Sequence, residues 1–213
     1  MEFIPTAIAK YAEDHSADEP QLLRELNRET HLKVMQPRML SGHLQGRILS
    51  MLSKMINPKN ILEIGTYTGY SALCLAEGLA TDGHLHTIDN NPERAELVNR
   101  YIVKAGFEKQ ITHHVGTASE LIPQIEGLFD LVFIDADKSN YSLYFDLIVD
   151  RVRSGGIILS DNVLWSGKVV EPVNPNDTDT IALLEFNRKL HRDSRIEIVL
   201  LPLRDGLSLA RKK

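Results

Sequence analysis

Cysteine is almost absent from this 213-residue chain: Cys74 is the single copy, so no disulfide can form within the chain. So little cysteine is typical of a reducing compartment, and we expect a cytoplasmic location. No run of ~18 apolar residues occurs, which excludes a membrane span by this criterion. A secretory signal is not predicted either, because the first twenty residues lack a basic region followed by an apolar one. The formal net charge of −5, from 24 basic and 29 acidic residues, disfavours a general nucleic-acid binder.

The composition is that of a folded globule, with 43% hydrophobic and 25% charged residues. The length predicts a single domain, 1–213, made of a helical N-terminal cap over 1–57 and an α/β core over 58–213. Helical spacing is clearest in the second half of the cap, before the stop signal Asn57-Pro58. The apolar residues of that helical stripe are Leu44, Ile48, Met51, Leu52 and Met55.

From residue 60 onward, short apolar runs alternate with amphipathic helical stretches. The helices are expected to about 80, through 106, near 118–125 and from about 139 to 152. Such alternation predicts a doubly wound, mainly parallel sheet with helices on both faces. The apolar runs are ILEIG (61–65), HLHTID (84–89), ITHHV (111–115), DLVFID (130–135) and GIILSD (156–161).

The pattern changes after residue 161. Residues 166–180 are rich in proline and asparagine and predict a loop, followed by a helix over about 178–190. The runs 195–203 and 206–211 lie so close together that they must pair as an antiparallel hairpin, because a parallel return needs a longer crossover. The whole is expected to be a mainly parallel sheet that ends in an antiparallel hairpin.

The first predicted strand leads into the pattern E-x-G-x-x-x-G, formed by Glu63, Gly65 and Gly69. Gly65 allows a tight turn off the strand, and Gly69 allows a helix to begin close to a ligand. The pattern differs from the G-x-G-x-x-G of nicotinamide binders. Asp89 ends the second strand, where a carboxylate can accept hydrogen bonds from both ribose hydroxyls. The alternatives are an ordinary strand-to-helix turn and a helix N-cap at Asp89.

Three oxygen donors follow the fourth and fifth strands. Asp135 ends one strand, and Asp161 and Asn162 end the next, so the three are expected to converge at one edge of the sheet. Two carboxylates and an amide oxygen suit Mg²⁺ or a similar hard cation. The alternative is that both acids cap the helices that follow them.

These segments together resemble the divalent-cation-dependent O-methyltransferases of the caffeoyl-CoA and catechol type. The likeness covers nearly all of 35–211 and implies a Rossmann-like class I methyltransferase fold with a seven-stranded sheet. It also implies S-adenosylmethionine (SAM) as cofactor, with Mg²⁺ or another hard cation such as Mn²⁺ or Ca²⁺. The matching pieces are MLSGHLQGRIL (39–49), ILEIGTYTGYSAL (61–73), HTIDNNPE (86–93), DLVFIDADKSNY (130–141) and SDNVLWSGKV (160–169).

By this resemblance, Asp135, Asp161 and Asn162 are the metal ligands, and Lys138 acts with Asp135 in catalysis. Asp89 binds the ribose, and Ala118 touches the adenine through its backbone. The complete cofactor-binding set is Ser41, Glu63, Gly65, Thr66, Ser71, Asp89, Ala118, Asp135 and Asp137.

The hypothesis is methyl transfer from the sulfonium of SAM to a hydroxyl by in-line displacement. A phenol has a pKa of about 10 and is a poor nucleophile near neutral pH. A divalent cation would stabilise its oxyanion and orient it. Lys138, at the mouth of the site, is expected to act as a base, since like charge disfavours its ammonium form. The alternative is that Lys138 pairs with a carboxylate and only screens charge.

A small phenolic or catechol-like acceptor is the leading prediction. The alternative within the same family is the hydroxylated wobble uridine of tRNA, for which Arg38, Arg47, Lys54 and Lys59 would form a basic patch. A nicotinamide-dependent oxidoreductase and a non-catalytic cofactor-binding protein are the interpretations outside this chemistry. The resemblance also implies a homodimer, and no membrane partner is expected.

Overall fold

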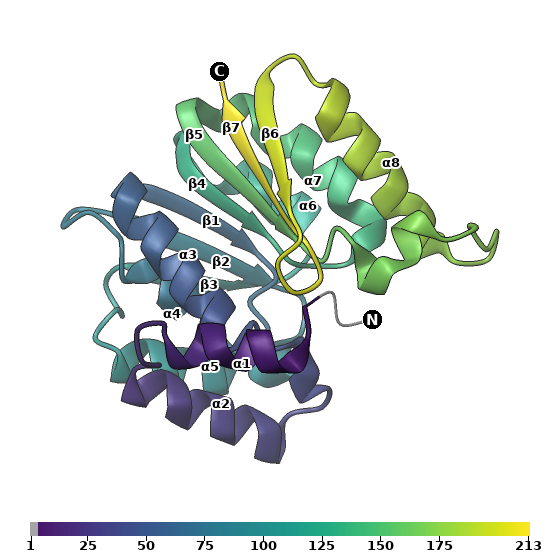
Figure 1. Cartoon of the computed structure of the whole chain (residues 1–213). Coiled ribbons are helices and arrows are strands. Elements are labelled where there is room, and N and C mark those ends of the chain that lie inside the picture. The colour runs from purple at the N-terminus through teal and green to yellow at the C-terminus, as the bar shows by residue number, and fades with distance from the viewer. Residues whose placement is uncertain (1–3) are drawn as a thin grey trace.

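The computed structural model describes residues 4–213, and its centre is a seven-stranded sheet with helices on both faces (Figure 1). The strands are β1 (Asn60–Ile64), β2 (His84–Asp89), β3 (Ile111–Val115), β4 (Phe129–Ile134), β5 (Val152–Asp161), β6 (Ile196–Leu201) and β7 (Leu207–Lys212). The α-helices are α1 (Thr6–Asp14), α2 (Gln21–Lys33), α3 (Gly42–Ile56), α4 (Tyr70–Ala76), α5 (Ala95–Lys104), α6 (Ala118–Leu121), α7 (Tyr141–Ile148) and α8 (Thr178–Arg192). Short 3-10 helices are η1 (Pro37–Met39), η2 (Pro92–Arg94), η3 (Ile122–Gln124), η4 (Lys138–Asn140), η5 (Val149–Arg151) and η6 (Trp165–Val170).

The strands are ordered β3-β2-β1-β4-β5-β7-β6 across the sheet. The first five are parallel, and β7 runs antiparallel to both of its neighbours. The doubly wound sheet and its C-terminal hairpin are therefore confirmed. Chain order reverses beside β1, with β2 and β3 on one side and β4 and β5 on the other. Open α/β sheets bind ligands in the crevice at such a reversal point.

Strand β1 shows how the apolar runs become a two-sided core. Ile61 faces the cluster formed with α3, α4 and α5, whereas Leu62 and Ile64 face the cluster formed with α6, α7 and α8. Because helices cover both faces of the parallel strands, every position of such a strand favours an apolar residue. The exception is Glu63, which is fully buried. A carboxylic acid at a fully buried position of β1 indicates that this end of the strand has a functional role.

Helix α3 is confirmed, but its buried side is not its apolar stripe. An apolar stripe is ordinarily the side of a helix that packs on the core. In α3, Met51 and Met55 are 59% and 75% exposed. The packed side needs small residues because α4 approaches closely: a Cβ on Gly46 would lie 2.7 Å from the Tyr70 ring. The buried residues of α3 are Gln45, Gly46, Leu49, Ser50 and Ser53.

Several boundaries differ from the sequence predictions. β5 begins at Val152 rather than 156, because a bulge opposite β4 extends the pairing. The helix expected over 139–152 is divided into η4, α7 and η5, and the loop expected over 166–180 begins within η6. The first three residues of the expected 1–57 cap lie outside the described residues. Within 4–213, no helix combines the length and the apolar character that crossing a bilayer requires.

Candidate active site

A cavity of about 1310 Å³ opens at the carboxyl end of the sheet, where chain order reverses. Residues that follow β1, β2, β4 and β5 form its floor. Its rim comes from α1, the segment that leads into α3, the 162–168 loop and the β6–β7 turn. The predicted site residues that line it are Ser41, Gly65, Asp89, Ala118, Asp135, Asp137, Lys138, Asp161 and Asn162.

Gly65 brings the ends of β1 and β4 into contact below this cavity. Its φ of +102° is a conformation that glycine adopts freely. A Cβ at this position would lie 1.8 Å from the carbonyl oxygen of Asp135, so no larger residue fits. The Asp135 backbone N–H in turn donates to the carbonyl of Ile64 at 2.8 Å. The turn after β1 thereby fixes where Asp135 leaves the sheet.

Asp89 lies at the end of β2 and is 9% exposed. One carboxylate oxygen accepts a hydrogen bond from the Tyr67 backbone N–H and the other from that of Asn91, both at 2.8 Å. The N-cap of the helical turn that follows is Asn91, whose side chain accepts from the Glu93 N–H at 2.9 Å. The two backbone donors hold the carboxylate at the cavity wall, so Asp89 does not serve as that cap.

Glu63, Thr66 and Ser71 form a buried polar group beneath the glycine turn and are not among the cavity-lining residues of the described chain. Burial raises the pKa of the Glu63 carboxyl to about 8. Its Oε2 accepts from the Thr87 hydroxyl at 2.5 Å, and Thr66 and Thr87 are hydrogen-bonded to each other. Hydrogen bonds from the Ser71 and Thr87 side chains offset part of this rise in pKa. These three residues therefore support the turn from behind.

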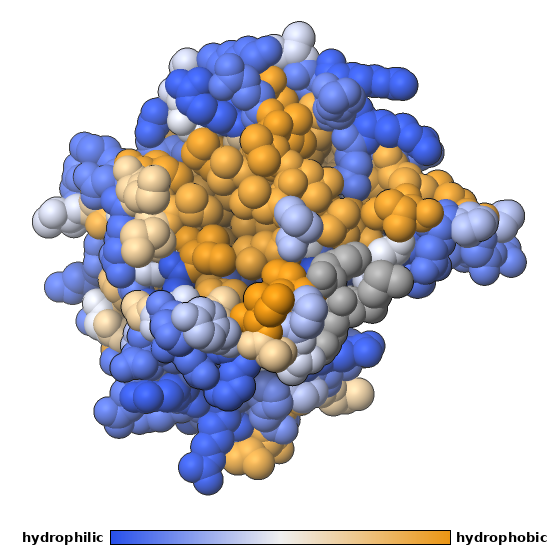
Figure 2. Space-filling model, in the orientation of Figure 1, coloured by the Kyte–Doolittle hydropathy of each residue, from blue (hydrophilic) through white to orange (hydrophobic). Residues whose placement is uncertain are grey.

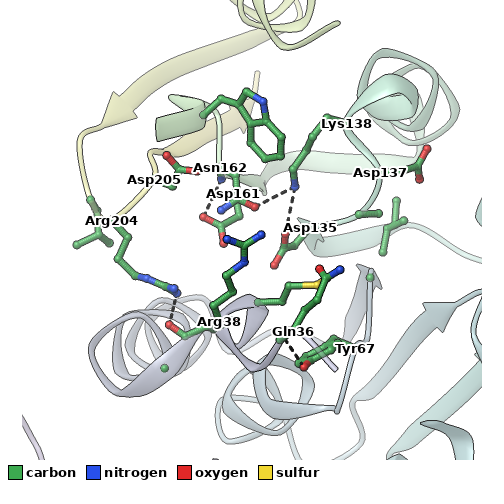
Figure 3. A pocket seen from close by; sticks show the side chains of 18 of the residues that line it. Gln36, Arg38, Tyr67, Asp135, Asp137, Lys138, Asp161, Asn162, Arg204 and Asp205 are labelled. Carbon is green, nitrogen blue, oxygen red and sulfur yellow. Dashed lines mark hydrogen bonds and ion pairs between the residues drawn. The ribbon is translucent and has the colours of Figure 1, made fainter. Parts of the chain in front are cut away.

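The predicted metal ligands and Lys138 face one another in the middle of the cavity (Figure 3). The Lys138 ammonium lies 3.3 Å from Asp135 Oδ1 and 2.9 Å from Asn162 Oδ1. It also donates to the Tyr141 hydroxyl at 2.6 Å. That hydroxyl donates to the Asp161 carbonyl at 3.0 Å. Lysine thus holds together the oxygens of two neighbouring strand ends.

Asp161 completes this group from the end of β5, where it is 3% exposed. Its Oδ1 accepts from the Asn162 N–H at 2.8 Å, and its Oδ2 accepts from the Gln45 side-chain amide at 2.7 Å. Burial, together with the nearby charge of Asp135, raises the pKa of Asp161 to about 6. The two carboxyl groups therefore lie close enough to oppose each other's ionisation. The described residues contain no metal-type cluster of three or more His, Cys, Asp or Glu side chains, and this set has two such residues plus an amide.

Asp137 lines the same cavity and accepts hydrogen bonds from side chains of η4 and α7. The Tyr144 hydroxyl donates to Asp137 Oδ1 at 2.6 Å, and the Asn140 side-chain amide donates to Oδ2. Ala118 contributes the first residue of α6, and Ser41 precedes α3 and is 5% exposed. The expected cofactor residues thus divide into a group at the cavity wall and the buried Glu63 group behind it.

Most of the basic residues expected to form a patch are engaged in ion pairs. Arg47 and Lys54 both reach Glu77, at 2.7 and 2.9 Å, and Lys59 reaches Asp82 at 2.8 Å. Arg38 differs, because it lines the cavity. Three of the four residues that the tRNA alternative would need as a basic patch are therefore paired with neighbouring carboxylates.

The O-methyltransferase family model matches residues 13–213. The chain belongs to the O-methyltransferase family. It is 39% identical over 205 residues to caffeoyl-CoA O-methyltransferase 2 of Eucalyptus globulus, an alignment that covers 91% of this chain and 83% of that protein. Caffeoyl-CoA O-methyltransferase 1 of Nicotiana tabacum is 40% identical, with 91% and 85% covered. Family membership decides against the nicotinamide-dependent oxidoreductase.

Solved O-methyltransferase structures share the whole fold. TomG from Streptomyces achromogenes, in complex with SAM, superposes with a TM-score of 0.90 at 28% identity over 97% of this chain and 96% of that one. An O-methyltransferase from Bacillus cereus, in complex with SAH, gives a TM-score of 0.91 at 28% identity, with 98% of each chain covered. The sheet order of this chain is therefore that of class I SAM methyltransferases.

Gln45 and Arg204 are site residues that the sequence did not reveal. Gln45 lies on the polar, buried side of α3, and only the observed packing shows which side that is. Arg204 lies in the β6–β7 turn, which the sequence indicated only as a hairpin link. Gln45 donates to Asp161, and Arg204 donates to Gln45, although the three residues come from segments far apart in the sequence. Single-sequence patterns carry no signal for such a pairing.

Proposed function

We propose that this O-methyltransferase moves a methyl group from SAM to a hydroxyl of a small phenolic or catechol-like acceptor, with the help of a divalent cation. One observation carries the proposal: oxygens from the ends of β4 and β5 meet around a single positive charge, the Lys138 ammonium. We also propose that 1–213 acts as one domain, with 1–57 as a helical cap on the 58–213 core.

The cavity wall supports SAM as the cofactor. Asp89 is oriented by two backbone donors and keeps lone pairs free for ribose hydroxyls. The turn at Gly65 has no side chain, so a ligand can approach its backbone closely. SAM and SAH occupy the related structures named above. Ser41, Ala118 and Asp137 would complete the wall around the cofactor, with Glu63, Thr66 and Ser71 supporting the turn.

The chemistry of the donor set fits a hard divalent cation. Asp135, Asp161 and Asn162 would hold Mg²⁺, Mn²⁺ or Ca²⁺ through oxygen atoms. Each Asp161 oxygen accepts one hydrogen bond and retains a second lone pair. A bound cation would favour the oxyanion form of the acceptor hydroxyl and fix its orientation. Lys138, released from these oxygens and in its neutral amine form, would take up the hydroxyl proton at Nζ.

A first prediction concerns the cation. Replacing Asp161 with Ala should lower turnover by about 100-fold or more and remove the response to added Mg²⁺, because one ligand is lost. The measurement is transfer from labelled SAM to a panel of catechols, with Mg²⁺ or with EDTA. Asp179→Ala is the matched control, since Asp179 also lines the cavity but lies on α8. Full activity of Asp161→Ala in EDTA would overturn the cation proposal.

A second prediction concerns Lys138. Lys138→Ala should reduce turnover by about 10²–10⁴-fold while SAM binding, measured by calorimetry, stays unchanged, because a general base acts only on the acceptor. Lys138→Arg separates the two roles considered from the sequence. Arginine keeps the positive charge but cannot accept a proton at neutral pH. Activity restored by arginine would show that Lys138 only screens charge.

The acceptor assay should include transfer RNA that lacks the wobble modification. The ion pairs of Arg47, Lys54 and Lys59 give an RNA acceptor no support. Methylation of this RNA, with no methylation of any catechol, would show that RNA and not a small phenol is the acceptor.

The cytoplasmic location stays a prediction.

We further propose a homodimer, formed through an apolar face of the sheet. The strands β5, β7 and β6 carry on this face Ile157, Leu209, Val199 and Leu201, of which Val199 is 55% exposed. Figure 2 shows the apolar area, which adjoins the outward stripe of α3. Glu197 and Arg211 form an ion pair on the same face. A surface that carries both charges can complement a second copy of itself about a two-fold axis.

A further inference from the structure

Three side chains from separate elements form a hydrogen-bonded chain that ends on a proposed metal ligand. Arg204 Nη1, in the β6–β7 turn, donates to Gln45 Oε1 at 2.7 Å. Gln45 Nε2, on α3, donates to Asp161 Oδ2 at 2.7 Å. Gln45 is 1% exposed and Asp161 is 3% exposed, so water cannot replace either bond easily. Arg204 and Asp161 both line the cavity (Figure 3), whereas Gln45, between them, is not among the cavity-lining residues of the described chain.

We propose that Gln45 and Arg204 are positioning residues that hold the Asp161 carboxylate in the orientation required for cation binding. The inference rests on the proposed cation site and deepens it. Neither residue needs to touch the cation or the substrate. Their effect is exerted through Asp161, whose other oxygen is held by the Asn162 backbone N–H.

Arg204 determines which way the Gln45 amide points. A guanidinium can only donate hydrogen bonds, so the amide oxygen must face Arg204 and the amide nitrogen must face Asp161. Arg204 is itself tied to the backbone, because it also donates to the carbonyls of Leu40 and Ser41 just before α3. The orientation of the Asp161 carboxylate therefore depends on the backbone at the start of α3.

The amide also keeps the arginine charge away from the cation position. A guanidinium placed directly on Asp161 would supply the same hydrogen bond, but its positive charge would compete with a divalent cation for the carboxylate. The neutral Gln45 amide lies between Arg204 and Asp161. It gives the carboxylate a hydrogen-bond donor without placing a full positive charge next to it. The arrangement therefore differs from a simple ion pair and predicts effects on cation affinity in particular.

The test measures Mn²⁺ binding to the purified full chain without SAM or acceptor, by the paramagnetic resonance signal of free Mn²⁺. Gln45→Met keeps the length of the side chain and removes the donor. We expect its Mn²⁺ dissociation constant to rise about 10–100-fold, as for other partners of metal ligands. Its affinity for SAM should stay close to that of the wild type, and its melting temperature should fall by only a few degrees, since two buried hydrogen bonds are lost. Gln21→Met, on the exposed side of α2, is the matched control and should change nothing.

A double-mutant cycle with Arg204→Met tests whether the two residues act as one unit. If Arg204 works through Gln45, Arg204→Met should weaken Mn²⁺ binding alone but add little in the Gln45→Met background. Additive effects would overturn the relay. Circular dichroism identifies a variant that fails to fold. In that case Gln45→Leu and Arg204→Lys replace the first pair in the same cycle.

The possible outcomes separate this inference from the proposed function. If the wild-type protein binds Mn²⁺ and Gln45→Met binds it equally well, the positioning role is overturned and the cation site stands. Absence of Mn²⁺ binding by the wild type would overturn both. A selective loss in Gln45→Met, with SAM affinity retained, is the result expected.

Discussion

At the scale of single residues, Gly65 has the least freedom to change. Its left-handed φ is one constraint, and the carbonyl of Asp135 directly above it is another. The two constraints are separable because Gly106 has a similar φ of +76°, and a Cβ added there would meet nothing within 4 Å. A substitution at Gly106 thus measures conformational strain alone, whereas one at Gly65 measures the strain together with a backbone collision.

Gly65→Ala is predicted to lower the free energy of unfolding by about 2–4 kcal/mol, since the backbone of β4 must move to admit a methyl group. Gly106→Ala should cost about 1 kcal/mol, which is the conformational penalty on its own. Denaturant unfolding of both variants measures the difference. Equal losses would mean that the contact between Gly65 and Asp135 contributes nothing.

At the scale of elements, α3 and α4 are joined by one carboxylate. Glu77, just after α4, accepts hydrogen bonds from Arg47, Ser50 and Lys54 of α3. Burial alone would raise the pKa of Glu77, but these hydrogen bonds outweigh it and lower the pKa to about 2. Because α3 also carries Gln45, this ion-pair group helps to position the helix that reaches the site.

Glu77 should make stability depend on pH in the acid range. A carboxyl with a lowered pKa stabilises the fold fully above its ordinary value of 4.5, and this contribution is lost as pH falls toward 2. Glu77→Gln should therefore lose about 1–2 kcal/mol at pH 7, after allowance for partial exposure, and show a flatter acid dependence. Unfolding curves between pH 7 and 2.5 provide the measurement. Asp82→Asn, which breaks an exposed pair, should behave like the wild type.

The elements also show what sequence patterns can and cannot determine. Alternating apolar runs predicted the five parallel strands because helices on both faces favour apolar residues along such strands, and the short link between 195–203 and 206–211 predicted the hairpin. The orientation of α3 could not be predicted, since close packing on α4 selects small residues such as Gly46 and leaves Met51 outside. In the site, strand ends placed Asp135, Asp161 and Asn162 correctly together at one edge. Glu63, expected among the cofactor-binding residues, lies behind the turn and does not line the cavity, so its contact with the cofactor stays a prediction.

At the scale of the whole molecule, the two sides of the sheet are covered unequally. Helices α6, α7 and α8 cover one side along its length, whereas α3, α4 and α5 cover only part of the other (Figure 1). The remainder is the apolar face of β5, β7 and β6 (Figure 2). Contiguous exposed apolar areas of this kind mark interaction surfaces. The proposed homodimer would cover it with the same face of a second copy.

Val199→Lys should weaken self-association by about 10-fold or more, because each subunit would bury a charge in the apolar interface. Sedimentation equilibrium over a range of protein concentrations measures the dissociation constant. Val103→Lys is the control, since Val103 is 62% exposed on α5, away from this face. A wild-type chain that remains monomeric at high concentration would contradict the homodimer.

The bond from Arg204 to the Ser41 carbonyl joins residues 163 positions apart. During synthesis from the N-terminus, the start of α3 leaves the ribosome long before the turn that will anchor it. Loop closure over such a distance is slow and comes late, so nearly the whole sheet must be in place first. Nascent chains would therefore hold the cofactor wall before they hold a correctly oriented Asp161. On the proposed role of Arg204, catalytic competence would come only after the β6–β7 turn has closed onto the start of α3.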